Sequence, residues 1–237
     1  MEQSRVIVVG LGGVGSWCAE ALVRSGLGNI TIVDSDLVSE TNINRQVQAT
    51  SLSLGRPKTE ALEERLKEIN PRCKVTSFHR VFSAETAEIF GIPGMNYVID
   101  AIDTLSCKLD LIESALASGK RLFSSMGMAR KLDPTLLKTS DIWETSGCPL
   151  ARLVREGLRK RKIDGHFTAV YSPEQIPNHS ADIERELGKI INGSSVTVTA
   201  AAGMVLASLV IRDIYAGNVH TGHAPHGEEH NSEGRHE

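Results

Sequence analysis

The first residues able to do chemistry form a glycine turn near the start of the chain. Gly10, Gly12 and Gly15 make a G-x-G-x-x-G pattern, and Gly13 adds a further glycine. Residues without Cβ atoms permit a tight turn and let a phosphate approach the backbone. Asp34 ends the next apolar run, where a carboxylate can accept hydrogen bonds from a ribose. The pattern predicts a nucleotide site, with a purely structural glycine turn as the alternative.

The segment after Asp34 adds polar groups that suit phosphate. Residues 37–56 are polar and turn-prone, and a connection of that length in a compact domain is usually functional. Arg45 within it could bind phosphate through two parallel hydrogen bonds, although a solvated arginine is the alternative. The strand end and the loop together offer four side chains for the nucleotide: Asp36, Asn42, Arg45 and Gln46.

Two further residues suit a nucleotide and its metal ion. Lys58 starts a predicted helix, where a cation opposes the helix dipole, so an anionic ligand nearby would explain it. Asp103 follows a predicted strand, where its carboxylate could hold Mg²⁺ beside phosphates. The alternatives are a surface lysine and a turn-forming aspartate. Arg45, Lys58 and Asp103 are therefore the candidate catalytic residues.

The elements that must position these residues alternate between apolar strands and amphipathic helices. This order predicts an α/β fold with a doubly wound, Rossmann-like and mostly parallel sheet. Ligands of such sheets bind beyond the carboxyl ends of the strands. The expected strands are 6–9, 30–33, 74–78, 97–100 and 121–123, and the expected helices follow residues 14, 57, 82 and 104.

The chain changes character after this core, which we place at residues 1–130. Residues 131–217 are predicted to form a smaller C-terminal extension that completes the fold. It contains an extended stretch at 132–144, a helix at 151–162, a strand at 167–171, a polar loop at 176–193 and a helix at 196–215. The apolar run at 196–211 is short for a membrane span, so we expect a buried helix. The histidine-rich tail, 218–237, is predicted to be disordered.

The composition is that of a globular chain without a dedicated nucleic-acid charge. The 237 residues carry a formal net charge of -3, so a nucleic-acid partner must be recognised by a local patch. The four cysteines are never spaced as C-x-x-C, which argues against a zinc ribbon or a disulfide framework. The first predicted strand starts almost at the first residue, so no signal peptide is expected. We expect a cytoplasmic protein without a membrane partner.

Residues 152–162 supply such a local patch. The predicted helix carries six cations: Arg152, Arg155, Arg159, Lys160, Arg161 and Lys162. They form either a solvated face or a surface that binds nucleic-acid phosphates without sequence preference. Cys148, just before the helix, is a candidate nucleophile, with a free thiol on a loop as the alternative.

Taken together, these motifs resemble the ubiquitin-activating-enzyme-like superfamily of ThiF, MoeB and HesA adenylyltransferases. The similar motifs are G-x-G-G-V-G, D-x-D-x-V-x-x-x-N-x-N-R-Q, the lysine 13 residues after that arginine, and D-A-I-D. The resemblance implies that Asp34 binds the ribose, Arg45 and Lys58 the triphosphate, and Asp103 the Mg²⁺ of ATP. It also implies that Gly12, Gly13 and Gly15 line the nucleotide, and that the chain forms a homodimer.

Finer features are similar to one branch, the tRNA threonylcarbamoyladenosine dehydratases. They include the segments S-S-M-G-M, D-P-T and Y-S-P-E-Q. The resemblance implies adenylation of the carboxylate of N6-threonylcarbamoyladenosine in tRNA, followed by ring closure. It makes Arg152, Arg155, Arg159 and Arg161 candidate tRNA-binding residues, and a sulfurtransferase a candidate partner.

Two other functions compete with the tRNA dehydratase. One is activation of the C-terminus of a ubiquitin-like or sulfur-carrier protein, although such activators commonly hold zinc with two C-x-x-C pairs. The other is an NAD-dependent dehydrogenase or an inactive nucleotide-binding scaffold. Asp34 would suit the ribose of NAD equally well, but Arg45, Lys58 and Asp103 have no obvious task there.

Overall fold

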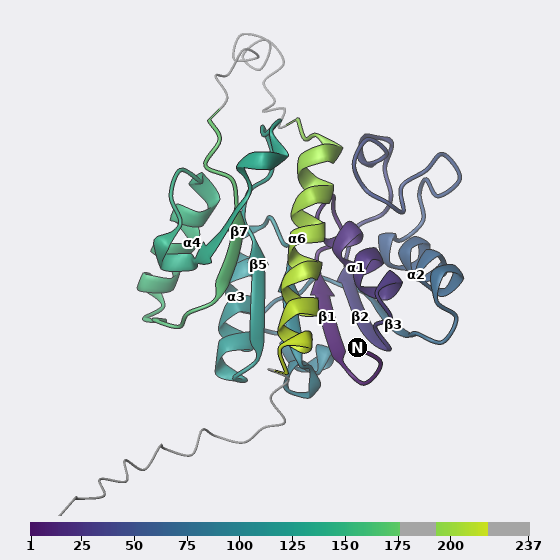
Figure 1. The fold of residues 1–237 in the computed structure, drawn as a ribbon, viewed down its shortest axis with the longest axis horizontal. Coiled ribbons are helices and arrows are strands. Elements are labelled where there is room, and N and C mark those ends of the chain that lie inside the picture. The colour runs from purple at the N-terminus through teal and green to yellow at the C-terminus, as the bar shows by residue number, and fades with distance from the viewer. Residues whose placement is uncertain (176–192, 218–237) are drawn as a thin grey trace, which may run out of the picture.

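A single seven-stranded sheet organises the chain in a computed structural model that describes residues 1–175 and 193–217 (Figure 1). The strand order is β3-β2-β1-β4-β5-β7-β6, and every pair is parallel except β6 with β7. The strands are β1 (Arg5–Val9), β2 (Asn29–Asp34), β3 (Lys74–His79), β4 (Tyr97–Asp100), β5 (Arg121–Ser125), β6 (Lys138–Asp141) and β7 (Thr168–Tyr171). The predicted doubly wound, mostly parallel α/β fold is confirmed.

Helices cover both faces of the sheet, which explains why the central strands are apolar on both sides. One face packs against α1 (Gly15–Arg24), α2 (Lys58–Ile69) and α6 (Val196–Tyr215), as Figure 1 shows. The other face packs against α3 (Leu105–Ala117) and α4 (Pro149–Lys160). The side chains of β1 alternate between the two hydrophobic cores, one on each face of the sheet. Val6 and Val8 pack into the core under α1, α2 and α6, and Ile7 and Val9 pack into the core under α3 and α4.

Short 3-10 turns interrupt two stretches for which the sequence predicted regular structure. Within 132–144, only β6 is a strand, and it lies between η4 (Pro134–Leu136) and η5 (Ile142–Glu144). Asp133 and Asp141 accept hydrogen bonds from the backbone N–H groups two residues ahead, and such local bonds favour turns over extended chain. The helix expected over 83–90 is reduced to η2 (Ala87–Phe90), followed by η3 (Ile92–Gly94).

The last helix, α6, has one buried and one exposed face. Its bounds match the prediction, and Val198, Leu206 and Val210 are fully buried, so the expected buried helix is confirmed for that face. Among the described residues, α6 alone is long and apolar enough to cross a membrane. The predicted polar loop falls almost entirely on residues 176–192, and the predicted disordered tail on 218–237, so both lie outside the described residues.

Candidate nucleotide-binding site

A cavity of about 410 Å³ opens at the carboxyl ends of β1, β2, β4 and β5. This is the position where open parallel sheets bind ligands. The cavity brings together all but one of the residues predicted to bind a nucleotide; the exception is Gly15, which does not line it. The lining residues that were predicted are Gly10, Gly12, Gly13, Asp34, Asp36, Asn42, Arg45, Gln46, Lys58 and Asp103.

The glycines of the turn have different roles. A Cβ on Gly15 would lie 1.8 Å from the carbonyl oxygen of Gly10, and a Cβ on Gly10 would lie 2.6 Å from that of Ala101. A Cβ on Gly13 would lie 3.0 Å from the side chain of Thr199 in α6. A Cβ on Gly12 meets nothing closer than Gln46 Nε2, at 4.0 Å. Packing therefore explains three of the glycines, whereas Gly12 leaves its space open to the cavity.

Asp34, at the end of β2, anchors the turn and one wall of the cavity. Its Oδ2 accepts a hydrogen bond from the Leu11 N–H at 2.6 Å, and its Oδ1 accepts one from the Asp36 N–H at 2.8 Å. Burial raises the pKa of this carboxyl, while the nearby Lys58 cation and the two N–H donors act in the opposite direction. The carboxylate thus faces the cavity with its orientation fixed by the backbone.

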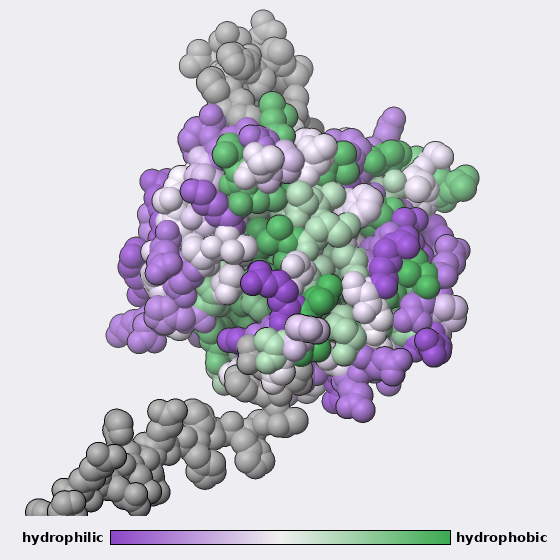
Figure 2. Space-filling view, viewed as in Figure 1, coloured by the Kyte–Doolittle hydropathy of each residue, from purple (hydrophilic) through white to green (hydrophobic). Residues whose placement is uncertain are grey.

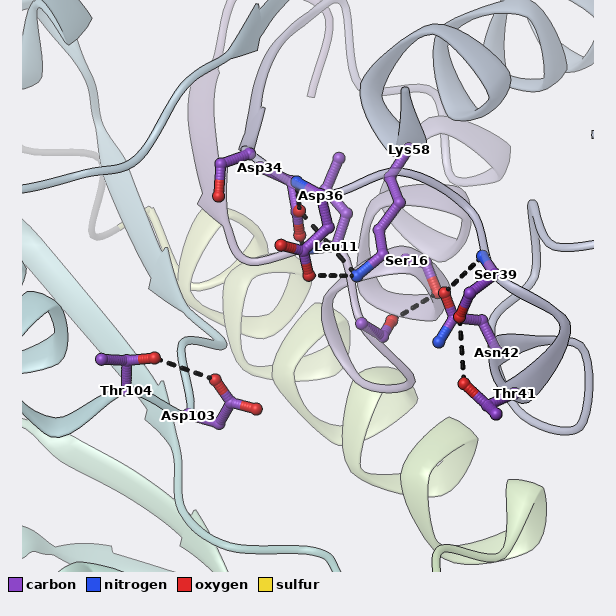
Figure 3. A network of polar contacts seen from close by, with 12 residues as sticks. Leu11, Ser16, Asp34, Asp36, Ser39, Thr41, Asn42, Lys58, Asp103 and Thr104 are labelled. Carbon is purple, nitrogen blue, oxygen red and sulfur yellow. Dashed lines mark hydrogen bonds and ion pairs between the residues drawn. The ribbon is translucent and has the colours of Figure 1, made fainter. Parts of the chain in front are cut away.

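Lys58 begins α2 and turns its ammonium toward these carboxylates (Figure 3). The ammonium donates a hydrogen bond to Asp36 Oδ2 at 2.7 Å and lies 3.9 Å from Asp34 Oδ1. The Lys58 side chain is only 7% exposed, so it is not a surface lysine, whereas that of Asp36 is 65% exposed. In this arrangement the chain's own carboxylates supply the anion that the sequence led us to expect near Lys58.

Arg45 lies on the loop after β2, which α1 holds in place. The Trp17 indole N–H donates a hydrogen bond to the Arg45 carbonyl at 3.0 Å, and the Val47 N–H donates one to Ser16 Oγ at 3.3 Å. The guanidinium donates to the carbonyl of Thr41 at 2.7 Å. Asn42 serves the same loop, because its Oδ1 accepts a hydrogen bond from the Ser39 N–H at 3.0 Å (Figure 3). The loop is therefore shaped before any ligand arrives.

Gln46 carries an acceptor that the described chain leaves without a partner. Its side chain is buried and lines the cavity, and its Oε1 makes no hydrogen bond within the described residues. A buried polar atom without a partner is costly unless a ligand or water satisfies it. The oxygen is itself buried, so a ligand in the cavity meets it only if the Gln46 side chain turns.

Asp103 lies on the opposite side of the cavity, in the turn between β4 and α3. Figure 3 shows it with Thr104, apart from the group formed by Asp34, Asp36 and Lys58. Its carboxylate is exposed and accepts only a weak hydrogen bond, from Thr104 Oγ1 at 3.4 Å. The side chain is thus free to bind a ligand in the cavity.

Several other residues shape this site, although no role was predicted for them from the sequence. Lys108 and Asp100 form a fully buried ion pair behind the Asp103 turn, with Lys108 Nζ 2.8 Å from Asp100 Oδ2. A lysine in an amphipathic helix usually faces solvent, so only the packing of α3 on the sheet reveals this one. Trp17 and the cavity-lining Arg80 are two more, and the cation just after β3 was the available signal for Arg80.

The basic helix α4 starts at the cavity rim, where Leu150 lines the cavity, but none of the four arginines predicted to bind tRNA does. The helix begins and ends two residues earlier than predicted, so Arg161 directly follows it. Arg155 donates hydrogen bonds to the backbone and side chain of Thr145. Arg161 pairs with two acidic residues of α3, Asp110 and Glu113. Arg159 stacks over the ring of Trp143, with its guanidinium 5.3 Å from the ring centroid. Arg152 has only a distant contact, 3.9 Å, with Glu156.

Cys148, the candidate nucleophile, is not among the residues that line the cavity. Its side chain is buried at the start of α4, against the wall of the cavity near Gly127. Cys107 lines the cavity instead.

Comparison with known proteins identifies the family of this chain. A protein-family model described as the ThiF family matches residues 1–228. The chain belongs to the ThiF family. The chain is 38% identical, over 90% of its length and 88% of the relative's, to a protein of Bacillus subtilis named tRNA threonylcarbamoyladenosine dehydratase.

Solved structures of ThiF-family proteins agree with this comparison. The Escherichia coli protein TcdA, a tRNA N6-threonylcarbamoyladenosine dehydratase, was solved in complex with ATP, and it is 33% identical to this chain. The two superpose with a TM-score of 0.82 over 93% of this chain and 89% of TcdA. The same protein in complex with AMP gives a TM-score of 0.81.

Proposed function

We propose that this ThiF-family chain is an ATP-dependent dehydratase that acts on N6-threonylcarbamoyladenosine in tRNA. The enzyme would adenylate the free carboxylate of the modified base and then close that base into a ring. One observation carries the proposal: the cavity gathers a glycine turn, a ribose acceptor, three cations and an exposed carboxylate in a chain similar to named dehydratases over most of its length.

ATP fits the residues that surround the cavity. The open side of Gly12 lets phosphate approach the loop, and Asp34 offers a fixed carboxylate to ribose hydroxyls. Lys58 exchanges Asp36 for phosphate oxygens, and the Arg45 guanidinium turns from the Thr41 carbonyl to the same phosphates. Each of these groups is present before the ligand binds.

Mg²⁺ suits the remaining carboxylate. Within the described residues, no three or more His, Cys, Asp or Glu side chains are grouped to hold a metal ion. Mg²⁺ fits such a site because it is usually held by one or two carboxylates together with substrate phosphates and water. Asp103 is the cavity-lining carboxylate that stands apart from the Lys58 group. Bound there, the metal ion would offset phosphate charge during pyrophosphate release.

The chemistry conserves all atoms without a protein nucleophile. A carboxylate oxygen of the modified base attacks the α-phosphorus of ATP, and pyrophosphate leaves. An atom of the same base then attacks the activated acyl carbon, and AMP leaves with the carboxylate oxygen. The chain's contribution is to align the two reactants and to neutralise the phosphates, which together account for most of the rate enhancement in such transfers. The buried position of Cys148 suits this route.

tRNA would bind along α4, the helix that starts at the cavity. Arg152, Arg159 and Lys160 are exposed on it, and such cations bind phosphates in a salt-dependent way. Arg155 and Arg161 also belong to the predicted set, but their contacts with Thr145, Asp110 and Glu113 give them a structural task as well. The exposed cations are therefore the better targets for a test.

Homodimer formation through α6 is also part of the proposal. Figure 2 shows hydrophobic residues, in pale to strong green, across the middle of the molecule, where α6 runs in Figure 1. Val196, Met204 and Tyr215 of this helix are exposed, and apolar patches of this kind often mark interfaces. A cytoplasmic location, a sulfurtransferase partner and the division at residue 130 remain predictions from the sequence.

The test is to incubate the protein with Mg-ATP and tRNA that carries N6-threonylcarbamoyladenosine, and then to analyse the nucleosides. We expect conversion to a product lighter by one water, with one pyrophosphate released per product. A Lys58→Met variant serves as the impaired control. Pyrophosphate exchange that depends instead on a protein ending in Gly-Gly would refute the tRNA substrate. Tight NAD binding without any response to Mg-ATP would refute the adenylation chemistry.

A further inference from the structure

The turn that carries Asp103 is held from beneath by three fully buried side chains. Asp100 ends β4, Lys108 lies in the first turns of α3, and Ser124 belongs to β5. All three are 0% exposed. Ser124 Oγ donates a hydrogen bond to Asp100 Oδ2 at 2.6 Å, and Lys108 Nζ lies 2.8 Å from the same oxygen. The network thus joins three elements directly below one side of the cavity.

Both polar groups of Ile102 are satisfied by this network. The Ile102 N–H donates a hydrogen bond to Asp100 Oδ1 at 3.1 Å, and Lys108 Nζ donates one to the Ile102 carbonyl at 2.8 Å. Ile102 directly precedes Asp103, whose own side chain has only the weak contact with Thr104. The position of the Asp103 carboxylate therefore depends on the backbone that Asp100 and Lys108 hold.

The same turn also supports the glycine loop. The carbonyl of Ala101 lies so close to Gly10 that a Cβ there would be 2.6 Å from the oxygen. The Ala101 N–H donates a hydrogen bond to the Val9 carbonyl at 2.9 Å. A displacement of the turn would thus reach both the proposed metal ligand and the loop that faces the nucleotide.

A contribution to stability is a weak explanation for the buried ion pair between Asp100 and Lys108. Removing two charges from water costs as much as their attraction returns, and buried ion pairs are often replaceable by apolar residues without loss. A fixed geometry is a stronger reason, since groups that orient a metal ligand commonly control its affinity. We propose that Asp100 and Lys108 are positioning residues that set the Asp103 carboxylate for the metal ion of Mg-ATP. This inference rests on the proposed function, because it assumes that Mg-ATP occupies the cavity.

The test measures how Mg²⁺ changes ATP affinity, in the absence of tRNA. ATP is titrated into each protein by calorimetry, first in EDTA and then at increasing Mg²⁺ concentration. The proteins are the parent chain, the single variant Lys108→Met, and a double variant that combines Lys108→Met with Asp100→Asn. In both variants we expect the Mg²⁺ requirement to rise by about 10- to 100-fold, and ATP affinity in EDTA, which reports on the glycine loop, to fall by less than that. The amide introduced by Asp100→Asn is uncharged. Its oxygen can still accept the bond from the Ile102 N–H, and its NH2 group can donate to Ser124 Oγ, so the double variant removes the charge pair without leaving a lone buried charge.

The matched control is Glu20→Gln, which removes a buried carboxylate that pairs with Arg24 of α1 and Arg65 of α2, both at least partly exposed, away from the cavity lining. It should lower the melting temperature without changing the Mg²⁺ requirement. A folded double variant with the parent's Mg²⁺ requirement would overturn the proposal, as would a parent chain whose ATP affinity does not respond to Mg²⁺. Failure of the tRNA substrate alone looks different, because the chain would then bind Mg-ATP normally but leave the tRNA unchanged.

Discussion

Replacement of Gly12 by alanine separates ligand binding from folding in the glycine loop. A Cβ at this position meets only Gln46 Nε2 at 4.0 Å, and the φ angle of Gly12 lies outside the left-handed region. We therefore expect the free energy of unfolding of the Gly12→Ala chain to stay within about 1 kcal/mol of the parent's. The new methyl group occupies the space through which phosphate reaches the backbone. Loss of one charge-assisted hydrogen bond there costs about 1.5–3 kcal/mol, or roughly 10- to 150-fold in ATP affinity.

Two other glycines calibrate this experiment. A Cβ on Gly15 overlaps the Gly10 carbonyl at 1.8 Å, so Gly15→Ala should lose about 1–3 kcal/mol or more of stability, because neither backbone can move away. Gly94 has nothing within 4 Å and is not part of the cavity lining, so Gly94→Ala should change neither property. Urea unfolding and calorimetric ATP titration measure both quantities. A folded Gly12→Ala chain with the parent's ATP affinity would refute the assignment of Gly12 to the ligand face.

Charged side chains at three places should respond to pH or to salt. Burial acts to raise the pKa of Glu20, but the hydrogen bonds and charges of Arg65 and Arg24 outweigh it and lower that pKa. The stabilisation from Glu20 is therefore complete above the usual glutamate pKa near 4.5, and it is lost as pH falls through the lowered pKa. In Glu20→Gln, the free energy of unfolding should therefore decrease less steeply as the solution is acidified. Burial raises the pKa of the Asp34 carboxyl, and the Lys58 cation acts against this rise. Loss of that cation in Lys58→Met should raise the pKa further, so ATP affinity should begin to fall at a higher pH in the variant than in the parent. An ATP affinity that falls at the same pH in both chains would contradict this. Charge reversal at the exposed Arg152 and Lys160 should weaken the salt dependence of tRNA binding. The slope of log K against log salt concentration should become shallower by about 0.7–0.9 for each phosphate contact that is lost. An unchanged slope in a filter-binding assay would exclude α4 as the tRNA surface.

Features that depend on local pattern could be predicted from the sequence. The β-branched run of β1, the spacing of the glycines and the acidic end of β2 together predicted where the cavity would form. The bounds of α6 followed from its apolar length. These signals are encoded within a few residues, because strands, turns and helices impose short periods on the chain.

Features that depend on tertiary packing could not be predicted in this way. Lys108 has the sequence context of a surface residue, and only the approach of α3 to β4 makes it a buried partner of Asp100. The basic segment is a second example, because its arginines look alike in the sequence but have different surroundings in the fold. Arg155 and Arg161 form hydrogen bonds or ion pairs with neighbouring residues, while Arg152 stays exposed. The 3-10 turns after Asp133 and Asp141 arise from side-chain caps that compete with the strand.

The contact between α6 and the glycine loop has a consequence for how the protein is made. Thr199 packs against Gly13, and α6 approaches α1 so closely that a Cβ on Gly203 would lie 2.5 Å from the Val14 carbonyl. The first motif of the chain is thus completed by its last described helix. Because synthesis runs from the amino terminus, a ribosome releases the loop, Lys58 and Asp103 long before the helix that buttresses them. Until then, the part of the sheet face that α6 covers stays open, although α1 and α2 already lie on that face, and the cavity lacks its Thr199 side.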